Sequence, residues 1–198
     1  KTQEDERLRL SRDLHDDVGA QLSALRLQLE SLSHETEETE KYSNPIGIID
    51  NTITDIRRIL MNLSPKSLDE FGLLNAIQEV IDKINSEKTQ IHLHINGIRE
   101  RIKSKDIETA LFRILQELLN NTLKYANASN ITIDLSYRDN KLIFIYEDDG
   151  KGFETRKTVL GYGIQNIKTR AALLGGNAEI NSTINKGMQA LITIPYAK

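Results

Sequence analysis

The sequence predicts an α+β protein in which an N-terminal antiparallel helical hairpin precedes an α/β sandwich with a mixed sheet. In residues 1–64, apolar side chains recur at steps of three and four, which is the period of helices that pack along one stripe. In residues 65–198, helical segments and alternating strands interleave without a regular order, which favours a mixed sheet covered by helices. The boundary is expected at Ser64-Pro65, because proline disfavours helix in the residue before it.

The composition excludes several classes of function. The formal net charge of −3 provides no basic footprint for duplex nucleic acid, so no nucleic-acid partner is expected. The sequence contains no cysteine, which excludes disulfides, thiolate metal sites and cysteine nucleophiles. No apolar run reaches the length of a membrane span, and the chain begins at Lys1 rather than Met. We therefore expect a cytoplasmic fragment of a longer protein, with any membrane anchor lying upstream.

A single long helix is expected over residues 4–33. Its apolar stripe contains two successive steps of four between Leu14 and Leu22, which locally change the winding of a helix against its partners. Gly19 lies within this stutter, and glycine costs about 1 kcal/mol relative to alanine in a helix interior. The segment that carries His15 and Asp16 is therefore expected to be the least rigid part of the helix. Taken alone, a helical histidine among charged residues is more often a solvated surface residue. The stripe comprises Leu14, Val18, Leu22, Leu25, Leu29 and Leu32.

A second helix is expected from Pro45 to Leu63, after an acidic loop over residues 34–44. Proline is well tolerated at the first position of a helix, where Ser43 or Asn44 would be the cap. The apolar seam of this helix comprises Ile46, Ile49, Ile53, Ile56, Leu60 and Leu63.

The two helices carry more apolar surface than one hairpin can bury, because Leu27, Ile48 and Ile59 lie outside the seams. We expect a homodimer in which two hairpins form a four-helix bundle. The alternative is that the hairpin packs on the domain that follows it.

The second domain, residues 65–198, is expected to begin with a helix and to end with two strands. The turn residues Asp139-Asn140 predict a β-hairpin, and Gly175-Gly176 predicts the end of a helix. The expected helices cover residues 71–85, 104–126 and 164–174, and the expected strands cover 90–96, 131–137, 141–147, 178–181 and 188–195.

Three motifs of the second domain contain residues suited to binding a nucleotide. Glu117, Asn121 and Lys124 are four and three positions apart and share one face of a regular helix. A carboxylate, an amide oxygen and an ammonium on one face suit a hard cation chelated by phosphates, although such spacing more often marks a solvated face.

The second motif, Asp148-Asp149-Gly150-Lys151-Gly152, directly follows an expected strand. Its carboxylate can accept a hydrogen bond from an exocyclic amine, and its glycines let the backbone approach a planar ring. The third motif, Gly161-Tyr162-Gly163, opens the next helix, where free backbone N–H groups can hold a phosphate. A lone Gly-x-Gly is also an ordinary turn.

In this order the motifs resemble the ATP-binding fold shared by gyrase, Hsp90, MutL and the sensor histidine kinases, a GHKL-type domain. The segment from Glu117 to Tyr125 is similar to the N box, and the two glycine motifs are similar to the glycine boxes. The segment Arg12-Asp13-Leu14-His15-Asp16 resembles the phosphoacceptor box of sensor histidine kinases of the NarX/DesK type. The resemblance covers nearly the whole chain. No Gly-x-x-x-x-Gly-Lys-Ser/Thr occurs, which agrees with a fold that binds ATP without a P-loop.

The resemblance implies that His15 accepts the γ-phosphate of ATP and that Asp16 orients or deprotonates the imidazole. It implies that Asn121 binds Mg²⁺ with Glu117 close by. Further residues implied in nucleotide binding are Lys124 (phosphate), Asp148 (adenine amine), Tyr125, Gly150, Gly152, Gly161 and Gly163. The region from Phe153 to Leu160 would form a lid, with Arg156 and Lys157 near the phosphates.

By this resemblance the chain is expected to be a protein histidine kinase that uses ATP and Mg²⁺, phosphorylates itself and passes the phosphoryl group to an Asp of a response-regulator receiver domain. Two alternatives are a dimerisation and nucleotide-sensing module without transfer, and an ATPase of the gyrase or Hsp90 type in which Glu117 activates water. The hairpin with His15 disfavours the ATPase.

Two departures from the family pattern affect these expectations. Relatives often carry Asp-x-x-x-Gln after the histidine, whereas this chain has Ala20 at the Gln position and Gln21 one residue late. One residue corresponds to about 100° around a helix, so weak phosphatase activity is expected. Relatives also commonly have Gly-Thr where this chain has Gly187-Met188, so the threonine contact to adenine is expected to be missing or mediated by water.

Two other candidate sites receive no support from the sequence. His92 and His94 alternate on an expected strand and lack a third ligand, which favours an exposed strand face over a metal site. The sequence has no Gly-x-Ser-x-Gly elbow, so hydrolase chemistry of that type is not expected.

Overall fold

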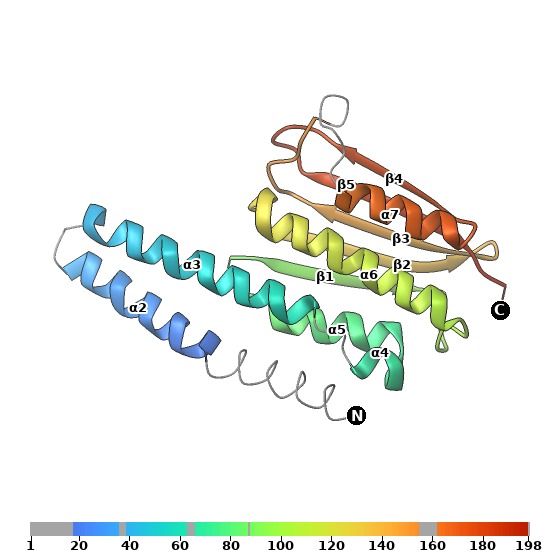
Figure 1. Cartoon of the computed structure of the whole chain (residues 1–198), viewed down its shortest axis with the longest axis horizontal. Coiled ribbons are helices and arrows are strands. Elements are labelled where there is room, and N and C mark those ends of the chain that lie inside the picture. Colours follow the sequence, from blue (N-terminus) through green and yellow to red (C-terminus); the bar gives the residue numbers. More distant parts are fainter. Residues whose placement is uncertain (1–17, 36–38, 63–65, 87, 155–161, 198) are drawn as a thin grey trace. The chain divides into compact units, whose positions relative to one another are not determined.

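The computed structural model in Figure 1 describes residues 18–35, 39–62, 66–86, 88–154 and 162–197. The chain divides into two compact units, residues 1–64 and residues 65–198. Among the described residues, no helix is both long enough and apolar enough to cross a bilayer.

The first unit is an antiparallel hairpin of helices α2 (Gly19–Glu35) and α3 (Thr39–Asn62), which lie side by side in Figure 1. The Arg26 guanidinium joins them, with Nε 2.9 Å from Asp50 Oδ1 and Nη2 2.6 Å from Glu30 Oε1. Ile49 of α3 is buried, with 7% of its surface exposed. Four other apolar side chains keep between 43% and 61% of their surface exposed: Leu25, Leu27, Leu32 and Ile48.

The expected start of the second helix at Pro45 is wrong, and so is the expected loop over residues 34–44. Helix α2 continues to Glu35, and α3 begins at Thr39 with Pro45 inside it. A proline within a helix removes one backbone N–H and crowds the carbonyl four residues earlier, here that of Lys41. Because Pro45 lies within the first two turns of α3, only a short segment before it is affected, and the helix persists.

The second unit contains a five-stranded mixed sheet of order β1-β2-β3-β5-β4, which confirms the expected fold class. Strand β1 is parallel to β2, and the other neighbouring pairs are antiparallel. Between β2 and β3, Asp139 and Asn140 have φ of 52° and 56°, as a two-residue hairpin turn of type I′ requires. The strands are β1 (Gln90–Asn96), β2 (Asn130–Arg138), β3 (Lys141–Asp148), β4 (Asn177–Ser182) and β5 (Met188–Pro195).

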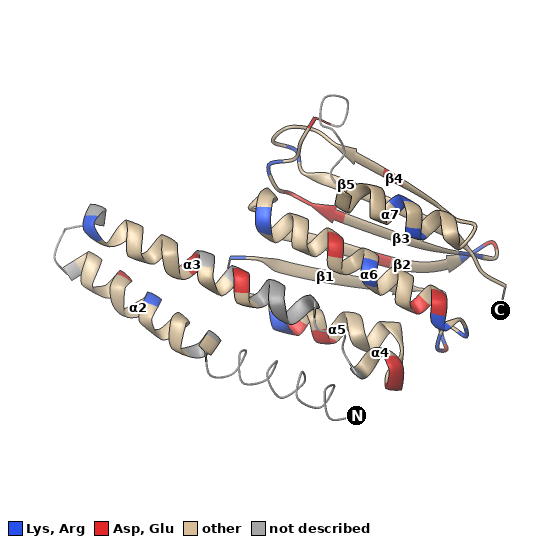
Figure 2. Ribbon diagram, viewed as in Figure 1, with Lys and Arg blue, Asp and Glu red and all other residues tan. Residues whose placement is uncertain are grey.

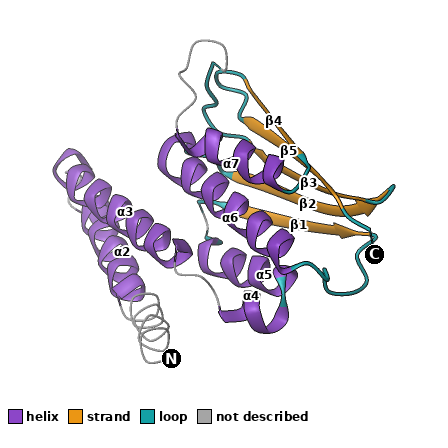
Figure 3. Cartoon of the chain, turned by 45° about the vertical axis from the view of Figure 1, so that its right-hand side comes forward, coloured by secondary structure: helices purple, strands orange, loops and turns teal. Residues whose placement is uncertain are grey.

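Helices cover one face of this sheet, as Figure 3 shows for α5, α6 and α7. The helices of the unit are α4 (Lys66–Phe71), α5 (Leu73–Ile84), α6 (Lys105–Asn121) and α7 (Tyr162–Leu173), and α6 continues as a π-helical segment, η2 (Thr122–Ala126). Alternate residues of β3 point toward the helices and are buried, namely Leu142, Phe144 and Tyr146. These side chains belong to the core between the helices and the sheet, and this buried row ends at Asp148.

The helix expected over residues 71–85 is confirmed as α5, and the short helix α4 that precedes it was not expected. Gly72 separates α4 from α5 with a φ of 84°, a conformation that favours glycine. The Glu108 carboxylate lies against this break and accepts a hydrogen bond from the Leu73 N–H at 3.0 Å. Arg101 holds the same carboxylate through Nε and Nη2 at 3.2 and 3.0 Å. The start of α6 is therefore joined to the connection between α4 and α5.

Candidate functional site

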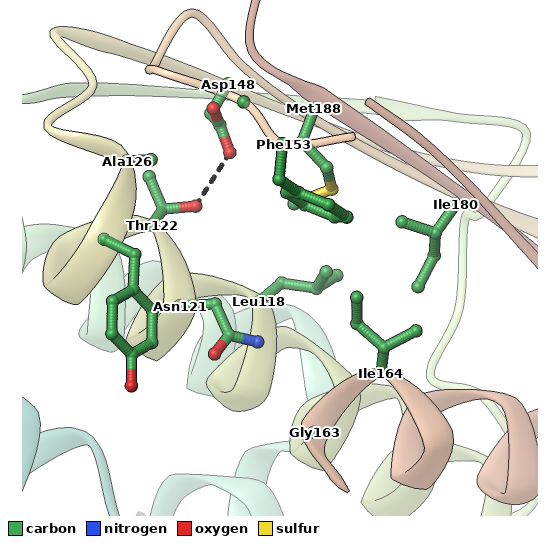
Figure 4. Close-up of a pocket in the computed structure, with 12 residues that line it drawn as sticks. Leu118, Asn121, Thr122, Ala126, Asp148, Phe153, Gly163, Ile164, Ile180 and Met188 are labelled. Atoms are coloured by element: carbon green, nitrogen blue, oxygen red, sulfur yellow. Dashed lines mark hydrogen bonds between the residues drawn. The ribbon is translucent and has the colours of Figure 1, made fainter. Parts of the chain in front are cut away.

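A cavity of about 410 Å³ opens between the end of α6, the end of β3 and the start of α7 (Figure 4). Most of its wall is apolar, and the polar groups converge from the helix and from β3. The lining residues are Leu118, Asn121, Thr122, Tyr125, Ala126, Asp148, Gly152, Phe153, Gly163, Ile164, Ile180 and Met188. Five of the residues proposed from sequence therefore meet here: Asn121, Tyr125, Asp148, Gly152 and Gly163.

Asp148 is the acidic group of this cavity. Figure 2 shows the run of acidic residues at the C-terminal end of β3, where Asp148 is the last residue. Its side chain is only 7% exposed. The Oδ1 atom accepts a hydrogen bond from the Gly150 N–H at 3.0 Å, and Oδ2 accepts one from the Thr122 hydroxyl at 2.9 Å. A buried carboxylate held from two sides is a rigid hydrogen-bond acceptor for a ligand amine.

Thr122 and Tyr146 complete this arrangement, and sequence reasoning missed both. The hydroxyl of Tyr146, which is fully buried, donates to Thr122 Oγ1 at 2.8 Å. Burial raises the pKa of Tyr146 far above its ordinary value; the hydrogen bond with Thr122 lowers it by less than burial raises it, and the nearby Asp148 carboxylate adds a smaller increase. Tyr146 therefore stays protonated. Its position was accessible from sequence, because residues two apart on a strand share a face and Tyr146 precedes Asp148 by two.

The neighbouring Asp149 has a different environment. Its Oδ1 accepts hydrogen bonds from the N–H groups of Ser129 and Asn130 at 2.8 and 2.9 Å, and Oδ2 accepts one from Asn130 Nδ2 at 2.8 Å. Partial burial raises the pKa of Asp149, but the hydrogen bonds from Asn130 and Ser129 outweigh this effect and lower it overall. Asp149 thus fastens the loop to the start of β2 and does not line the cavity.

Two glycines let the loop after β3 pass close to other backbone. A Cβ at Gly150 would lie 2.5 Å from the Cβ of Ala126, at the end of η2. Gly152 has a φ of 57°, and a Cβ there would overlap the Thr183 carbonyl oxygen. Next to it, the Phe153 N–H donates to Ser182 Oγ at 2.8 Å, which holds Phe153 at the cavity wall.

Glu117, Asn121 and Gly163 form a polar corner at the start of α7. A Cβ at Gly163 would overlap Glu117 Oε1 and would lie 3.4 Å from Asn121 Nδ2, so the missing side chain lets the Glu117 carboxylate lie against the start of α7. A carboxylate and an amide beside the N-terminus of a helix suit a phosphate chain with a hard cation. Among the described residues no three His, Cys, Asp or Glu side chains cluster as a metal site, so such a cation would need phosphate and water ligands as well.

Lys124 lies outside the cavity lining. Its ammonium sits 4.8 Å from the ring centre of Tyr125, and both side chains are exposed. The helix becomes π-helical at Thr122, so the regular spacing that places Lys124 on the face of Glu117 and Asn121 does not extend to it.

Comparisons with known proteins agree with this geometry. Residues 6–68 match a family described as histidine kinase, and residues 106–198 match the family described as histidine kinase-, DNA gyrase B-, and HSP90-like ATPase. The sensor histidine kinase LiaS of Bacillus subtilis is 32% identical over 197 residues, which cover 96% of this chain and 54% of LiaS. This chain belongs to the sensor histidine kinase family.

Other relatives of this chain within the family are similarly distant. UhpB of Salmonella typhimurium, named a signal transduction histidine-protein kinase/phosphatase, is 31% identical over 98% of this chain and 40% of its own length. The chain thus spans about half the length of the curated relatives it matches. The histidine kinase domain of the blue-light activated histidine kinase EL346 from Erythrobacter litoralis aligns with a TM-score of 0.55 at 14% identity, over 98% of this chain and 93% of that domain, which shows a shared fold.

Several residues expected from the histidine kinase pattern lie outside the described residues: His15, Asp16, Arg156, Lys157 and Gly161. Met188, which stands where relatives commonly have threonine, lines the cavity. It lies on β5 opposite Asp148 of β3. A hydroxyl does reach Asp148 from the helical side, where Thr122 Oγ1 donates to Oδ2.

Proposed function

We propose that this chain is the kinase core of a two-component signalling protein, which binds ATP in the cavity, transfers the γ-phosphoryl group to His15 and passes it to an Asp of a response regulator. The observation that supports it most directly is the buried Asp148 carboxylate in an apolar cavity. An adenine ring suits such a site, since its faces are apolar and its exocyclic amine donates to a carboxylate.

The triphosphate would extend from the adenine site toward Gly163 and the start of α7. Asn121 and Glu117 are the described residues that fit Mg²⁺, one through its amide oxygen and the other through its carboxylate. The cation would neutralise phosphate charge during transfer. We propose that Lys124 and Tyr125 act at the open side of the site, near the phosphates.

In the transfer step, a nitrogen of the His15 imidazole bonds to the γ-phosphorus while the bond from that phosphorus to the β–γ bridging oxygen breaks, and ADP leaves. Asp16 orients the imidazole or accepts the proton of its other ring nitrogen. Catalysis then depends mainly on positioning and charge neutralisation.

We propose that residues 1–64 form the dimerisation and phosphoacceptor domain and that residues 65–198 form the catalytic domain. The exposed apolar side chains of α2 and α3, such as Leu25 and Ile48, favour a homodimer through a four-helix bundle.

Transfer to His15 predicts that incubation with Mg²⁺ and γ-labelled ATP gives acid-labile label on the protein. His15→Gln should carry no label, because the acceptor nitrogen is missing. His34→Gln is the matched control and should be labelled like the wild type, since His34 lies in the last turn of α2. An unlabelled wild type that still binds ATP would support the nucleotide-sensing module instead, and release of free phosphate without protein label would support an ATPase.

The Ala20 departure predicts weak phosphatase activity. A phosphorylated regulator mixed with this protein should lose phosphate about as slowly as the regulator alone, because no glutamine follows Asp16 by four positions. Ala20→Gln should accelerate the loss, and Gln21→Ala should leave it unchanged. Rapid loss of phosphate from the regulator with the wild type would contradict this prediction. The measurement is informative because the relative UhpB is named a kinase/phosphatase.

A further inference from the structure

We infer that Thr122 and Tyr146 are positioning residues of the nucleotide site, whose hydrogen-bond chain makes Asp148 select an aminopurine over an oxopurine. This inference rests on the proposed binding of ATP in the cavity. It assigns a role to two residues to which the motifs gave none: Thr122, which lies within the N-box segment, and Tyr146, which lies on β3.

The direction of the hydrogen bonds that link Tyr146, Thr122 and Asp148 follows from their donors and acceptors. A tyrosine hydroxyl carries one proton, and that of Tyr146 is directed to Thr122 Oγ1 at 2.8 Å in a fully buried position. Since Thr122 Oγ1 already accepts this bond, its own proton is available for Asp148 Oδ2, which lies 2.9 Å away (Figure 4). Both hydrogen bonds are therefore donated in the same direction, from Tyr146 to Thr122 and from Thr122 to Asp148.

The carboxylate is held from its other side as well. The Gly150 N–H donates to Asp148 Oδ1 at 3.0 Å, so each oxygen has one fixed donor and can accept a further bond from a ligand. An ionised carboxylate in this arrangement presents acceptors only. An aminopurine offers an N–H there, whereas an oxopurine presents an oxygen that repels the carboxylate.

The position of Thr122 is set by an irregular turn of the helix. Its N–H is shared between the carbonyls of Leu118 and Leu119, at the point where α6 becomes the π-helical segment η2. Such π-helical turns occur often at functional sites. At this wider turn the Thr122 hydroxyl is directed at β3. The hydrogen bonds of Thr122 therefore join the helical layer to the sheet beside the cavity.

The test measures dissociation constants of ADP and of inosine diphosphate for the purified full chain by calorimetry. Thr122→Val keeps the shape of the side chain and removes the hydroxyl, and it should weaken ADP binding about tenfold, since the bond involves a charged acceptor. Binding of inosine diphosphate should change much less, so the preference for ADP should fall. Thr122→Ser restores the hydroxyl and should restore the preference, and Tyr146→Phe should lower it partially.

Thr89→Val is the matched control, because Thr89 is a buried threonine whose hydroxyl donates to the Ala128 carbonyl at 3.3 Å, and Thr89 lies outside the cavity lining. It removes the same group and should leave the preference unchanged. A structural role alone would lower stability without changing the ratio of the two dissociation constants.

Equal ratios for the wild type, Thr122→Val and Tyr146→Phe would overturn the inference while leaving ATP binding intact. Should Thr122→Val fail to fold, the ratio for Tyr146→Phe decides by the same criterion. A wild type that binds neither nucleotide would contradict the proposed function itself, and the inference with it.

Discussion

Replacing Asp148 with Asn is expected to weaken ADP binding about 100-fold, which corresponds to about 2.8 kcal/mol. The substitution keeps the size of the side chain but removes the charge and turns one acceptor atom into a donor. Hydrogen bonds to charged groups contribute about 1.5–3 kcal/mol. The measurement is calorimetric titration of the folded variant with ADP, compared with the wild type at the same pH and salt concentration.

Asp149→Asn is the matched control for this experiment. Asp149 is the next residue along the chain, and its carboxylate is bound by Ser129 and Asn130 outside the cavity lining. This variant should bind ADP like the wild type and should lose some stability. Hydrogen bonds lower the pKa of Asp149 in the folded protein. The ionised Asp149 carboxylate therefore contributes to the free energy of unfolding at neutral pH, and this contribution disappears as the pH falls through the lowered pKa. Equal ADP binding by Asp148→Asn and the wild type would place the nucleotide elsewhere.

Replacing Arg101 with Met is expected to destabilise the second unit by about 3 kcal/mol, the lower end of the cost of breaking a buried ion pair. The Glu108 side chain is only 2% exposed and would lose its charged partner, while the Arg101 side chain is 44% exposed and partly solvated. The guanidinium also donates to the carbonyls of Leu68, Asp69 and Glu70 at 3.1 to 3.2 Å, so the end of α4 would lose these bonds too. Urea unfolding followed by circular dichroism measures the effect.

Lys105→Met provides the comparison for Arg101→Met. Lys105 also links the start of α6 to α4, because its ammonium lies 2.8 Å from the Asp69 carboxylate, but the two side chains are 74% and 63% exposed. Exposed pairs of this kind contribute about 0–1 kcal/mol, so this variant should stay close to the wild type. Similar losses in the two variants would show that burial of Glu108 does not decide the effect.

Local patterns in the sequence were sufficient for most of the second unit. The turn at Asp139-Asn140 and the end of α7 before Gly175, which has a φ of 69°, depend on neighbouring residues only. Motif spacing also identified residues that the fold brings to one cavity, such as Asn121 and Asp148, which lie on different elements.

The sequence by itself determined the two kinds of architecture, the order of the elements in the second unit and its main polar residues, because periodicity, turns and caps are local properties of the chain. Only the tertiary structure decided where one helix is separated from the next, as at Gly72, and where a helix becomes π-helical, as at Thr122. It also decided which polar groups meet at the cavity. Thr122 bonds to residues 24 and 26 positions away, so its role depends on how the helical layer packs on the sheet. No local pattern specifies that packing, since it arises from the apolar surfaces that both layers bury together.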